Sequence, residues 1–262
     1  MRLVTTRIVQ ITDLHLLANP QERLRGVPVY EAVSQVVRHV RQKVPDAARL
    51  IISGDLAQDE LAPTYDVLCN LLGDWLARTR AIPGNHDNRF ALRRAFEATT
   101  ATTGDEVGFV DDVDSWRLIG LDTQLPGAVA GEVAADHLAW LAAQLSAASS
   151  TPTLLFMHHP PVQVDTPWLD SIGLRNADRF ADRLSEHPQV QLVCCGHVHL
   201  EHAVQLGATQ VVTTPSAAFQ FAPNTPTQSY DYIPPGYRVI ELTDGKVESR
   251  VVRLPELVYP PE

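Results

Sequence analysis

Five short clusters of Asp, Asn and His residues stand out in the sequence, because each of them directly follows an apolar run. The clusters are Asp13-Leu14-His15, Gly54-Asp55, Gly84-Asn85-His86-Asp87, His158-His159 and Gly196-His197-Val198-His199. Imidazole nitrogens combined with carboxylate and amide oxygens, without a thiolate, suit Mn²⁺, Fe or Zn²⁺ better than Mg²⁺ or Ca²⁺. Five such clusters, if they converge, can hold two metal ions.

The spacing within the clusters fits a two-metal centre. Metal ions about 3.5–4 Å apart need a bridging ligand, which a carboxylate provides best. Asp55 is the candidate bridge, because it ends an apolar run and the glycine before it permits a tight turn. Asp13 and His15 alternate at a strand end and can leave it toward one point, as can His197 and His199. One such cluster alone is more often a turn, so the inference depends on all five in this order.

Strands and crossover helices are the elements that must position these clusters. Four stretches have the apolar spacing of amphipathic helices, at 31–44, 64–75, 134–145 and 176–184. Apolar, β-rich segments lie at 7–12, 49–53, 80–82, 107–111, 116–122, 153–157, 190–195, 203–206, 209–213, 237–242 and 247–253. The alternating first half favours parallel strands, and the strand-rich last third favours antiparallel pairing. We expect a mixed α/β fold in which two sheets pack face to face with helices outside.

The sequence predicts a single domain over residues 1–254 and a poorly ordered tail over 255–262. No repeat or low-complexity linker divides the chain. Polar stretches at 99–103 and 147–152 predict surface loops. The segment 222–235 is rich in Pro, Thr, Ser and Tyr, and we expect it to form a long loop near the site.

Composition and charge exclude several classes of protein. The net charge of −10 argues against a nucleic-acid partner. No segment approaches the roughly 20 apolar residues of a membrane span, and the N-terminus enters a strand-like segment too early for a signal peptide. We interpret Cys69, Cys194 and Cys195 as reduced residues, since adjacent strand residues face opposite ways and cannot pair. These features favour a cytoplasmic protein, which we expect to be a monomer or homodimer.

The five clusters, in this order, resemble the signature of the calcineurin-like metallophosphoesterases. The resemblance covers residues 13 to 199 and, with the flanking strands, nearly the whole chain. It implies a two-sheet β-sandwich flanked by helices and a dinuclear centre that holds Fe or Mn, with Zn as a further possibility. It implies that the first metal is held by Asp13, His15, Asp55 and His199. It implies that the second metal is held by Asp55, Asn85, His158 and His197.

Other residues narrow the resemblance to one class of enzyme within this family. In protein phosphatases an acid stands three residues after the bridging Asp, and Glu follows Gly-Asn-His. Gln58 and Asp87 occupy these positions here, which argues against that class and leaves open what orients His86. Ten segments resemble bacterial class III cyclic nucleotide phosphodiesterases: 10–16, 54–57, 83–87, 121–123, 158–161, 168–170, 174–177, 195–199, 214–216 and 235–238. This resemblance implies hydrolysis of 3′,5′-cyclic AMP to AMP.

The implied chemistry fits the side chains. Two metals lower the pKa of a bridging water and polarise the phosphoryl oxygens, and the hydroxide then attacks in line and expels the 3′ oxygen. His86 is not a ligand in this family and is suited to protonate the leaving oxygen. The alternative is that His86 only hydrogen-bonds beside the metals. We interpret His159 and Asp122 as structural.

The segment from Trp168 to Asn176 is predicted to shape the nucleotide pocket. It offers Trp168 for stacking on the base, and Arg175 and Asn176 as hydrogen-bond donors. The alternative is a structural role, with Trp168 in the core and Asn176 capping a helix. The residues predicted to bind substrate are His86, Asn85, Arg175 and Asn176.

Two other functions are compatible with the same residues. One is hydrolysis of 2′,3′-cyclic nucleotides or glycerophosphodiesters, which a panel of substrates separates from cyclic AMP hydrolysis. The other is a non-enzymatic scaffold on the same fold. Missing ligands would mark such a scaffold, and here every ligand position is filled.

Overall fold

The first sheet is built around the N-terminal strands. The computed structural model describes residues 5–96 and 103–262. Its first sheet has the order β13 (Lys246–Arg253), β12 (Gly236–Thr243), β1 (Thr6–Ile11), β2 (Arg49–Ser53), β3 (Thr79–Ile82). β1, β2 and β3 are parallel, and β12 runs antiparallel to β1 and β13. The three middle residues of β2, 50–52, are all apolar and buried, because both faces of the sheet are covered.

The second sheet has six strands. Their order is β4 (Phe109–Val113), β5 (Trp116–Leu121), β6 (Thr153–Met157), β7 (Val190–Cys195), β9 (Thr209–Thr213), β8 (His202–Leu206). The four strands β5, β6, β7 and β9 are parallel, while β4 and β8 are antiparallel edge strands. A separate pair, β10 (Gln220–Phe221) and β11 (Tyr230–Asp231), forms a small projecting hairpin.

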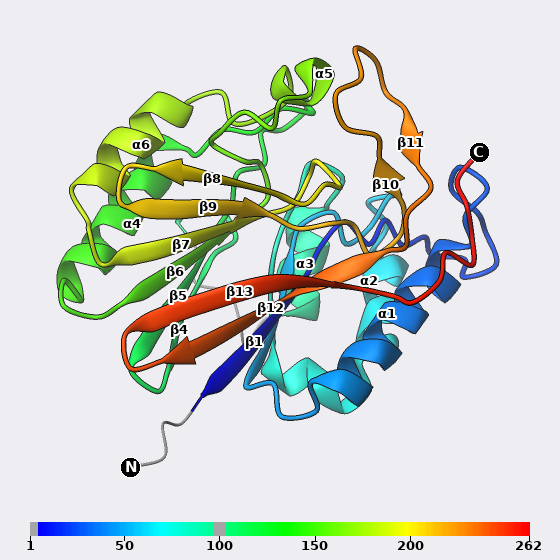
Figure 1. Ribbon diagram of the computed structural model, residues 1–262, viewed down its shortest axis with the longest axis horizontal. Coiled ribbons are helices and arrows are strands. Elements are labelled where there is room, and N and C mark those ends of the chain that lie inside the picture. Colours follow the sequence, from blue (N-terminus) through cyan, green and yellow to red (C-terminus); the bar gives the residue numbers. More distant parts are fainter. Residues whose placement is uncertain (1–4, 97–102) are drawn as a thin grey trace.

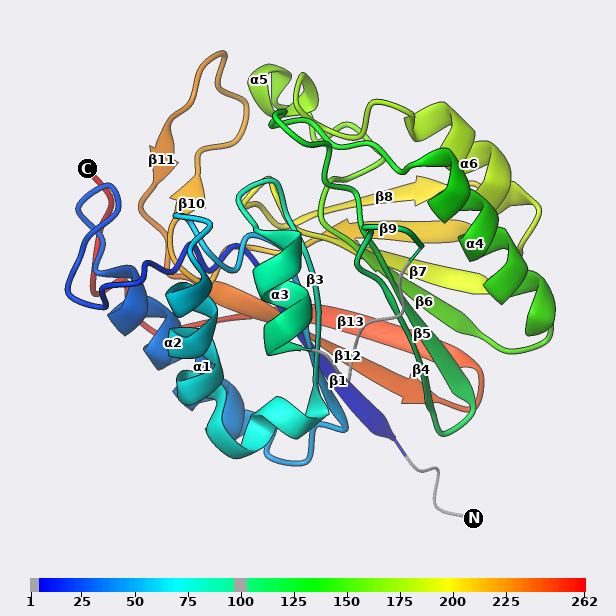
Figure 2. The ribbon, with the colours of Figure 1, turned by 180° about the vertical axis from the view of Figure 1, so that it is seen from behind.

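Helices cover the outer face of each sheet (Figure 1). The first sheet carries α1 (Val29–Lys43), α2 (Ala62–Leu72), a 3₁₀ helix (Gly73–Arg78) and α3 (Arg89–Ala95). The second sheet carries α4 (Ala135–Ala147) and α6 (Ala177–Ser185), which Figure 2 shows from behind. The short α5 (Pro167–Asp170) lies at the end of the molecule where the β10–β11 hairpin projects. The predicted sandwich with outer helices is confirmed.

Alternate residues of the inner strands fill different cores. Ile8 and Ile51 face the second sheet and pack in one cluster with Leu154. Cys194 belongs to this inter-sheet core, whereas Cys195 packs under α4 and α6. The two thiols are therefore on opposite faces, as predicted, and all three cysteines are free.

Several local features differ from the sequence-based expectation. The helix α3 was not predicted, and the expected loop 222–235 contains β11. The tail also packs against the protein, because the N–H of Glu262 donates to the carbonyl of Arg25 at 3.0 Å. The expected polar loop 99–103 falls, except for its last residue, outside the described residues.

The topology brings the five clusters together. They follow β1, β2, β3, β6 and β7, all of which belong to the parallel sections of the two sheets. Parallel strands end at a common edge, so loops that follow them meet there. In the described part of the chain, no helix is long and apolar enough to cross a membrane.

Candidate metal centre

The predicted ligands of both sheets converge on one point. The Nε2 atoms of His15 and His199 are 3.1 Å apart. His199 Nε2 lies 3.3 Å from Asp13 Oδ1, and His158 Nε2 lies 3.4 Å from Asp55 Oδ2. All five side chains are buried. Two carboxylates and several imidazoles therefore face one another away from solvent.

An unusual backbone conformation presents these side chains. Five predicted ligands have positive φ angles of 48° to 70°, a region that non-glycine residues seldom adopt. They are Asp13, His15, Asp55, His197 and His199. Such strain persists only where surrounding contacts impose it, and it concentrates at functional sites.

Two glycines permit the close approach of the loops. Gly54 has a φ of 102°, and a Cβ there would lie 2.2 Å from His158 Nδ1. A Cβ on Gly84 would lie 2.2 Å from Asp55 Oδ1. These glycines let the loops after β2 and β3 and the loop after β6 come into direct contact.

Each of the four predicted imidazole ligands is anchored through one ring nitrogen. The anchoring pairs are His15 Nδ1 with Gln58 Oε1 (2.8 Å), His158 Nδ1 with Ser53 O (2.9 Å), His197 Nε2 with Ile172 O (3.1 Å) and His199 Nδ1 with Phe219 O (2.8 Å). The other ring nitrogen is left for the centre. Metal-binding histidines typically donate their second N–H to an oxygen in this way, which fixes the tautomer and the ring orientation.

Buried polar atoms without partners provide a test of whether metals fit. Asn85 Oδ1 and His158 Nε2 are both buried and make no hydrogen bond. Such atoms are costly unless something binds them. Among the described residues, four triads of His, or of His and Asp, each place their three ligand atoms within 4.8 Å of one another. The residues present thus fit a pair of metal ions.

The electrostatics of the cluster favour a cation. Burial raises the pKa of the Asp55 carboxyl, but His158 and His15 outweigh it and hold that pKa well below its usual range. Burial lowers the pKa of His158, but Asp55 outweighs it and raises that pKa to about 9. Burial lowers the pKa of His15 to about 4, so this ring is neutral at neutral pH. A metal would replace the proton that His158 carries, since ligation requires the neutral ring.

Asp87 supports two of the ligand loops, a role that the sequence did not reveal. Its carboxylate accepts hydrogen bonds from the backbone N–H groups of Leu56, Ala57 and Gly84, and from the hydroxyl of Tyr65. Each of these bonds is 2.8–3.1 Å long. Asp87 therefore ties the loop after β2 to the loop after β3.

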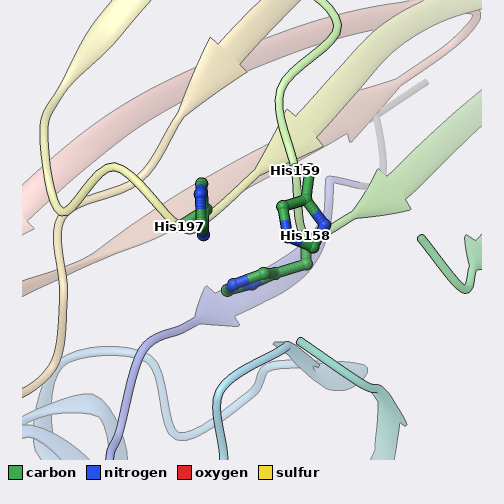
Figure 3. Close-up of side chains that lie close together, drawn as sticks. All are labelled: His158, His159 and His197. Atoms are coloured by element: carbon green, nitrogen blue, oxygen red, sulfur yellow. The ribbon is translucent and has the colours of Figure 1, made fainter. Parts of the chain in front are cut away.

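His159 lies against the cluster and is fully engaged elsewhere. Figure 3 shows its ring beside those of His158 and His197, and the centroids of His159 and His197 are 4.4 Å apart. Its Nδ1 is 2.7 Å from Thr123 Oγ1 and its Nε2 is 3.0 Å from Val129 O. Both nitrogens are used by the protein, which supports the structural interpretation.

His86 stands at the rim of the cluster. Its backbone N–H donates to Asp55 Oδ1 at 2.9 Å, which ties it to the predicted bridging carboxylate. Its ring Nδ1 lies 3.1 Å from the amide nitrogen of Gln58. Gln58 thus orients His86, which answers the question left by the sequence.

A cavity of about 260 Å³ opens above the cluster and has an aromatic wall. Trp168 lines it, as predicted, but Phe219, Phe221 and Tyr230 were not predicted. The rings of Phe221 and Tyr230 are stacked with centroids 5.9 Å apart, and Trp168 meets Phe221 edge-on at 4.9 Å. The expectation that 222–235 lies near the site covers Tyr230, whereas Phe219 and Phe221 lie just before that segment.

Two residues predicted to bind substrate lie elsewhere. The Asn176 amide bonds the backbone of Val133 twice, at 2.8 and 3.1 Å. Arg175 donates its backbone N–H to Gly131, and neither Arg175 nor Asn176 lines the cavity above the cluster. A substrate-binding role for them stays a prediction, and the Asn176 bonds favour a role in holding the loop.

The fold and the buried His/Asp centre together define a metal-dependent hydrolase. The model of the calcineurin-like phosphoesterase family matches residues 6–201, and the chain belongs to this family. The family resemblance read from the sequence is confirmed.

Curated relatives match the chain over nearly its full length. The chain is 33% identical to the 3′,5′-cyclic adenosine monophosphate phosphodiesterase CpdA of Pseudomonas aeruginosa over 253 residues, which cover 96% of this chain and 91% of that protein. It is 33% identical to CpdA of Escherichia coli K12, with 98% and 92% coverage. It is 31% identical to the 3′,5′-cyclic-nucleotide phosphodiesterase alr5338 of Nostoc, with 95% and 92% coverage.

Solved structures share the fold at low identity. A dimetal phosphatase from Danio rerio superposes with a TM-score of 0.66 at 15% identity, covering 95% of this chain and 98% of that one. The purple acid phosphatase PPD1 of yellow lupin also gives 0.66 at 13% identity, covering 94% of this chain and 51% of that one. Identities this low establish the architecture alone.

Proposed function

We propose that the protein is a cytoplasmic phosphodiesterase that hydrolyses 3′,5′-cyclic AMP to AMP with two metal ions, Fe or Mn and alternatively Zn. It acts as a monomer or homodimer. The relatives of similar length that are named cyclic nucleotide phosphodiesterases support this proposal.

The proposal depends mainly on one observation: His199 belongs both to the metal cluster and to the aromatic wall of the cavity. Its Nε2 lies among the ligands, and its ring face stacks on Phe221 at 4.3 Å. A ligand that places a phosphate at the cluster therefore places its remaining groups against Phe221 and Tyr230. A nucleoside has the flat apolar face that such a wall accommodates.

The metal ions, when bound, activate a water and polarise the phosphoryl oxygens. Asp13, His15, Asp55 and His199 would hold the first ion, and Asp55, Asn85, His158 and His197 the second. Asn85 supplies a buried oxygen that the protein leaves unpaired. His86 lines the cavity beside the ligands and donates its ring N–H to the leaving 3′ oxygen. The loops around the cluster bury it and limit the access of bulk water.

A substrate panel tests this function. The protein is stripped with chelator, reloaded with Mn²⁺, Fe²⁺ or Zn²⁺, and assayed on 3′,5′-cyclic AMP, 2′,3′-cyclic AMP and a glycerophosphodiester. We expect preferential turnover of 3′,5′-cyclic AMP by the reloaded protein and none by the stripped protein.

Asp55→Asn provides the matched test of the bridging carboxylate. It keeps the size of the side chain and removes the charge that faces both ions, so metal content and activity should both fall sharply. Asp112→Asn, an exposed carboxylate paired with Arg117, is the control. Faster turnover of either alternative substrate, or full activity in Asp55→Asn, would overturn the proposal.

A further inference from the structure

We infer that Gln58 is a positioning residue that fixes the ring proton of His86 on Nε2 when His15 binds metal. This inference rests on the proposed metal centre and deepens it. It gives a role to a side chain that is neither a metal ligand nor a proton carrier.

The Gln58 amide lies between two histidine rings. Its Oε1 is 2.8 Å from His15 Nδ1, and its Nε2 is 3.1 Å from His86 Nδ1. The two rings meet edge to face with centroids 5.3 Å apart. The Gln58 backbone is fixed as well, because its N–H donates to Leu16 O at 2.8 Å. The amide therefore contacts both rings from one defined position.

The two ends of the Gln58 amide differ, because one accepts and the other donates a hydrogen bond. The proton position in one ring therefore determines the proton position in the other. When His15 gives the lone pair of Nε2 to a metal, its proton is on Nδ1, and this N–H must donate to an oxygen. The amide oxygen of Gln58 must then face His15, and the NH₂ group must face His86. An NH₂ group only donates hydrogen bonds. His86 Nδ1 must therefore accept, which leaves its proton on Nε2.

The consequence for the reaction is a donor that is set before the substrate arrives. His86 lines the cavity, and in this tautomer its free N–H is on Nε2. Preorganised donors stabilise charge where it develops in the transition state. A neutral histidine is known to act in this way in other enzymes. His86 then supplies a hydrogen bond to the leaving oxygen as the P–O bond breaks, and a water molecule in the open cavity supplies the proton that completes the 3′ hydroxyl.

A carboxylate at position 58 would not produce the same tautomer. It accepts from both rings, so it would hold a proton on Nδ1 of His86 as well as of His15. Gln58→Glu and Gln58→Leu therefore separate the polarity of the amide from its bulk. Gln205→Leu changes an exposed glutamine of β8 that contacts Gly207 and serves as the matched control.

The test reads the tautomer directly. Protein labelled with ¹⁵N-histidine is loaded with zinc, which is diamagnetic, and its ring nitrogens are observed by long-range ¹H–¹⁵N correlation. His86 is assigned by the signals that His86→Ala removes. We expect the proton on Nε2 in the wild type and in Gln205→Leu, a mixture of tautomers in Gln58→Leu, and a proton on Nδ1 in Gln58→Glu.

Kinetics at saturating zinc give a second readout. Changes to residues that orient a metal site typically cost 10–100-fold. We expect Gln58→Leu to lower kcat for cyclic AMP by this amount with KM nearly unchanged, while Gln205→Leu keeps full activity. If Gln58→Leu does not fold, Gln58→Met takes its place.

The outcomes separate this inference from the proposed function. A zinc-loaded wild type with the His86 proton on Nδ1 overturns the inference and leaves the proposed function intact. A proton on Nε2 in the zinc-loaded protein, together with no hydrolysis of cyclic AMP after loading with Mn²⁺, Fe²⁺ or Zn²⁺, supports the inference and overturns the proposed function. Failure of the wild type to bind any of Mn²⁺, Fe²⁺ and Zn²⁺ overturns both.

Discussion

Most of the predicted metal ligands are held by backbone conformations that most side chains avoid. His197 has a φ of 70°, and its N–H donates to Asp13 at 3.0 Å. Ser216 supports the loop that carries Asp13, because its hydroxyl donates to the carbonyl of Asp13 at 2.7 Å. Hydrogen bonds of this kind offset the cost of each left-handed residue, which is about 1–3 kcal/mol. The cluster therefore depends on contacts between loops far apart in the sequence.

At the residue scale, His86→Ala tests the donor at the leaving oxygen. Loss of one preorganised donor typically costs about 10²–10³ in kcat. We expect a loss of this size on cyclic AMP and a much smaller loss on a bis(nitrophenyl) phosphate, whose leaving group needs no stabilisation. Metal content, measured by elemental analysis, should stay near that of the wild type. An equal loss on both substrates would show that His86 acts by placing Asn85 or the metals.

The sequence identified the residues that converge at the centre, but not the groups that orient them. Asp13 and His158 each follow an apolar run directly, so their position is a local property of the chain. The function of Gln58 depends on partners 43 and 28 residues away, His15 and His86. Such pairings arise only when the loops of different strands meet, and no local pattern encodes them.

At the scale of elements, α4 is joined to the second sheet by a buried histidine. His137 lies in the first turn of α4, and its side chain is fully buried. Its ring stacks on Trp140 at 4.9 Å, and its Nε2 accepts a hydrogen bond from the N–H of Asp122 at 3.2 Å. The helical period alone does not distinguish a buried imidazole from an exposed one, because histidine occurs on both faces.

His137 should make the stability of the fold depend on pH. Burial lowers its pKa from 6.5 to about 4, so the unfolded chain binds the proton more readily between these values. Its stabilising contribution is complete above about pH 6.5 and falls as the pH drops toward 4, by at most about 3 kcal/mol. Urea unfolding of the wild type and His137→Asn at pH 7.5 and 5 measures this. The difference between the two proteins should shrink at pH 5.

A matched variant shows whether this effect belongs to His137. His202 lies at the start of β8 and is only half buried. His202→Asn removes a half-buried histidine at the edge of the second sheet and should change the free energy of unfolding only slightly. A constant difference between the wild type and His137→Asn across the same range would contradict the prediction.

Elements were predicted best where the amphipathic pattern is long. The fifteen residues of α1 bury one continuous apolar face. The seven-residue α3 gave no such pattern. It is capped by Asn88, which directly follows the Gly84-Asn85-His86-Asp87 cluster and whose side chain accepts from the N–H of Ala91. In the sequence, Asn88 therefore resembles one more residue of the loop that carries Asn85. Whether a helix follows depends on tertiary contacts.

At the scale of the whole molecule, the centre connects the two sheets. Asp13 and Asp55 follow strands of the first sheet, whereas His158 and His197 follow strands of the second. Apart from the centre, the two sheets pack against each other through an apolar core that includes Ile8. A metal held by both sets of ligands binds only the folded arrangement, so its binding free energy adds to the stability of the whole sandwich.

Metal removal should therefore lower the melting temperature of the entire domain in one transition. At a free metal concentration 100 times the Kd, one site adds about 2.7 kcal/mol, which corresponds to roughly 5–10 °C for a chain of this size. Differential scanning calorimetry of protein treated with EDTA, before and after Mn²⁺ or Zn²⁺ is restored, measures the shift. Asp55→Asn should lose most of the response and Asp112→Asn should keep it. An unchanged melting temperature after EDTA, or a full response in Asp55→Asn, would show that the centre does not link the sheets.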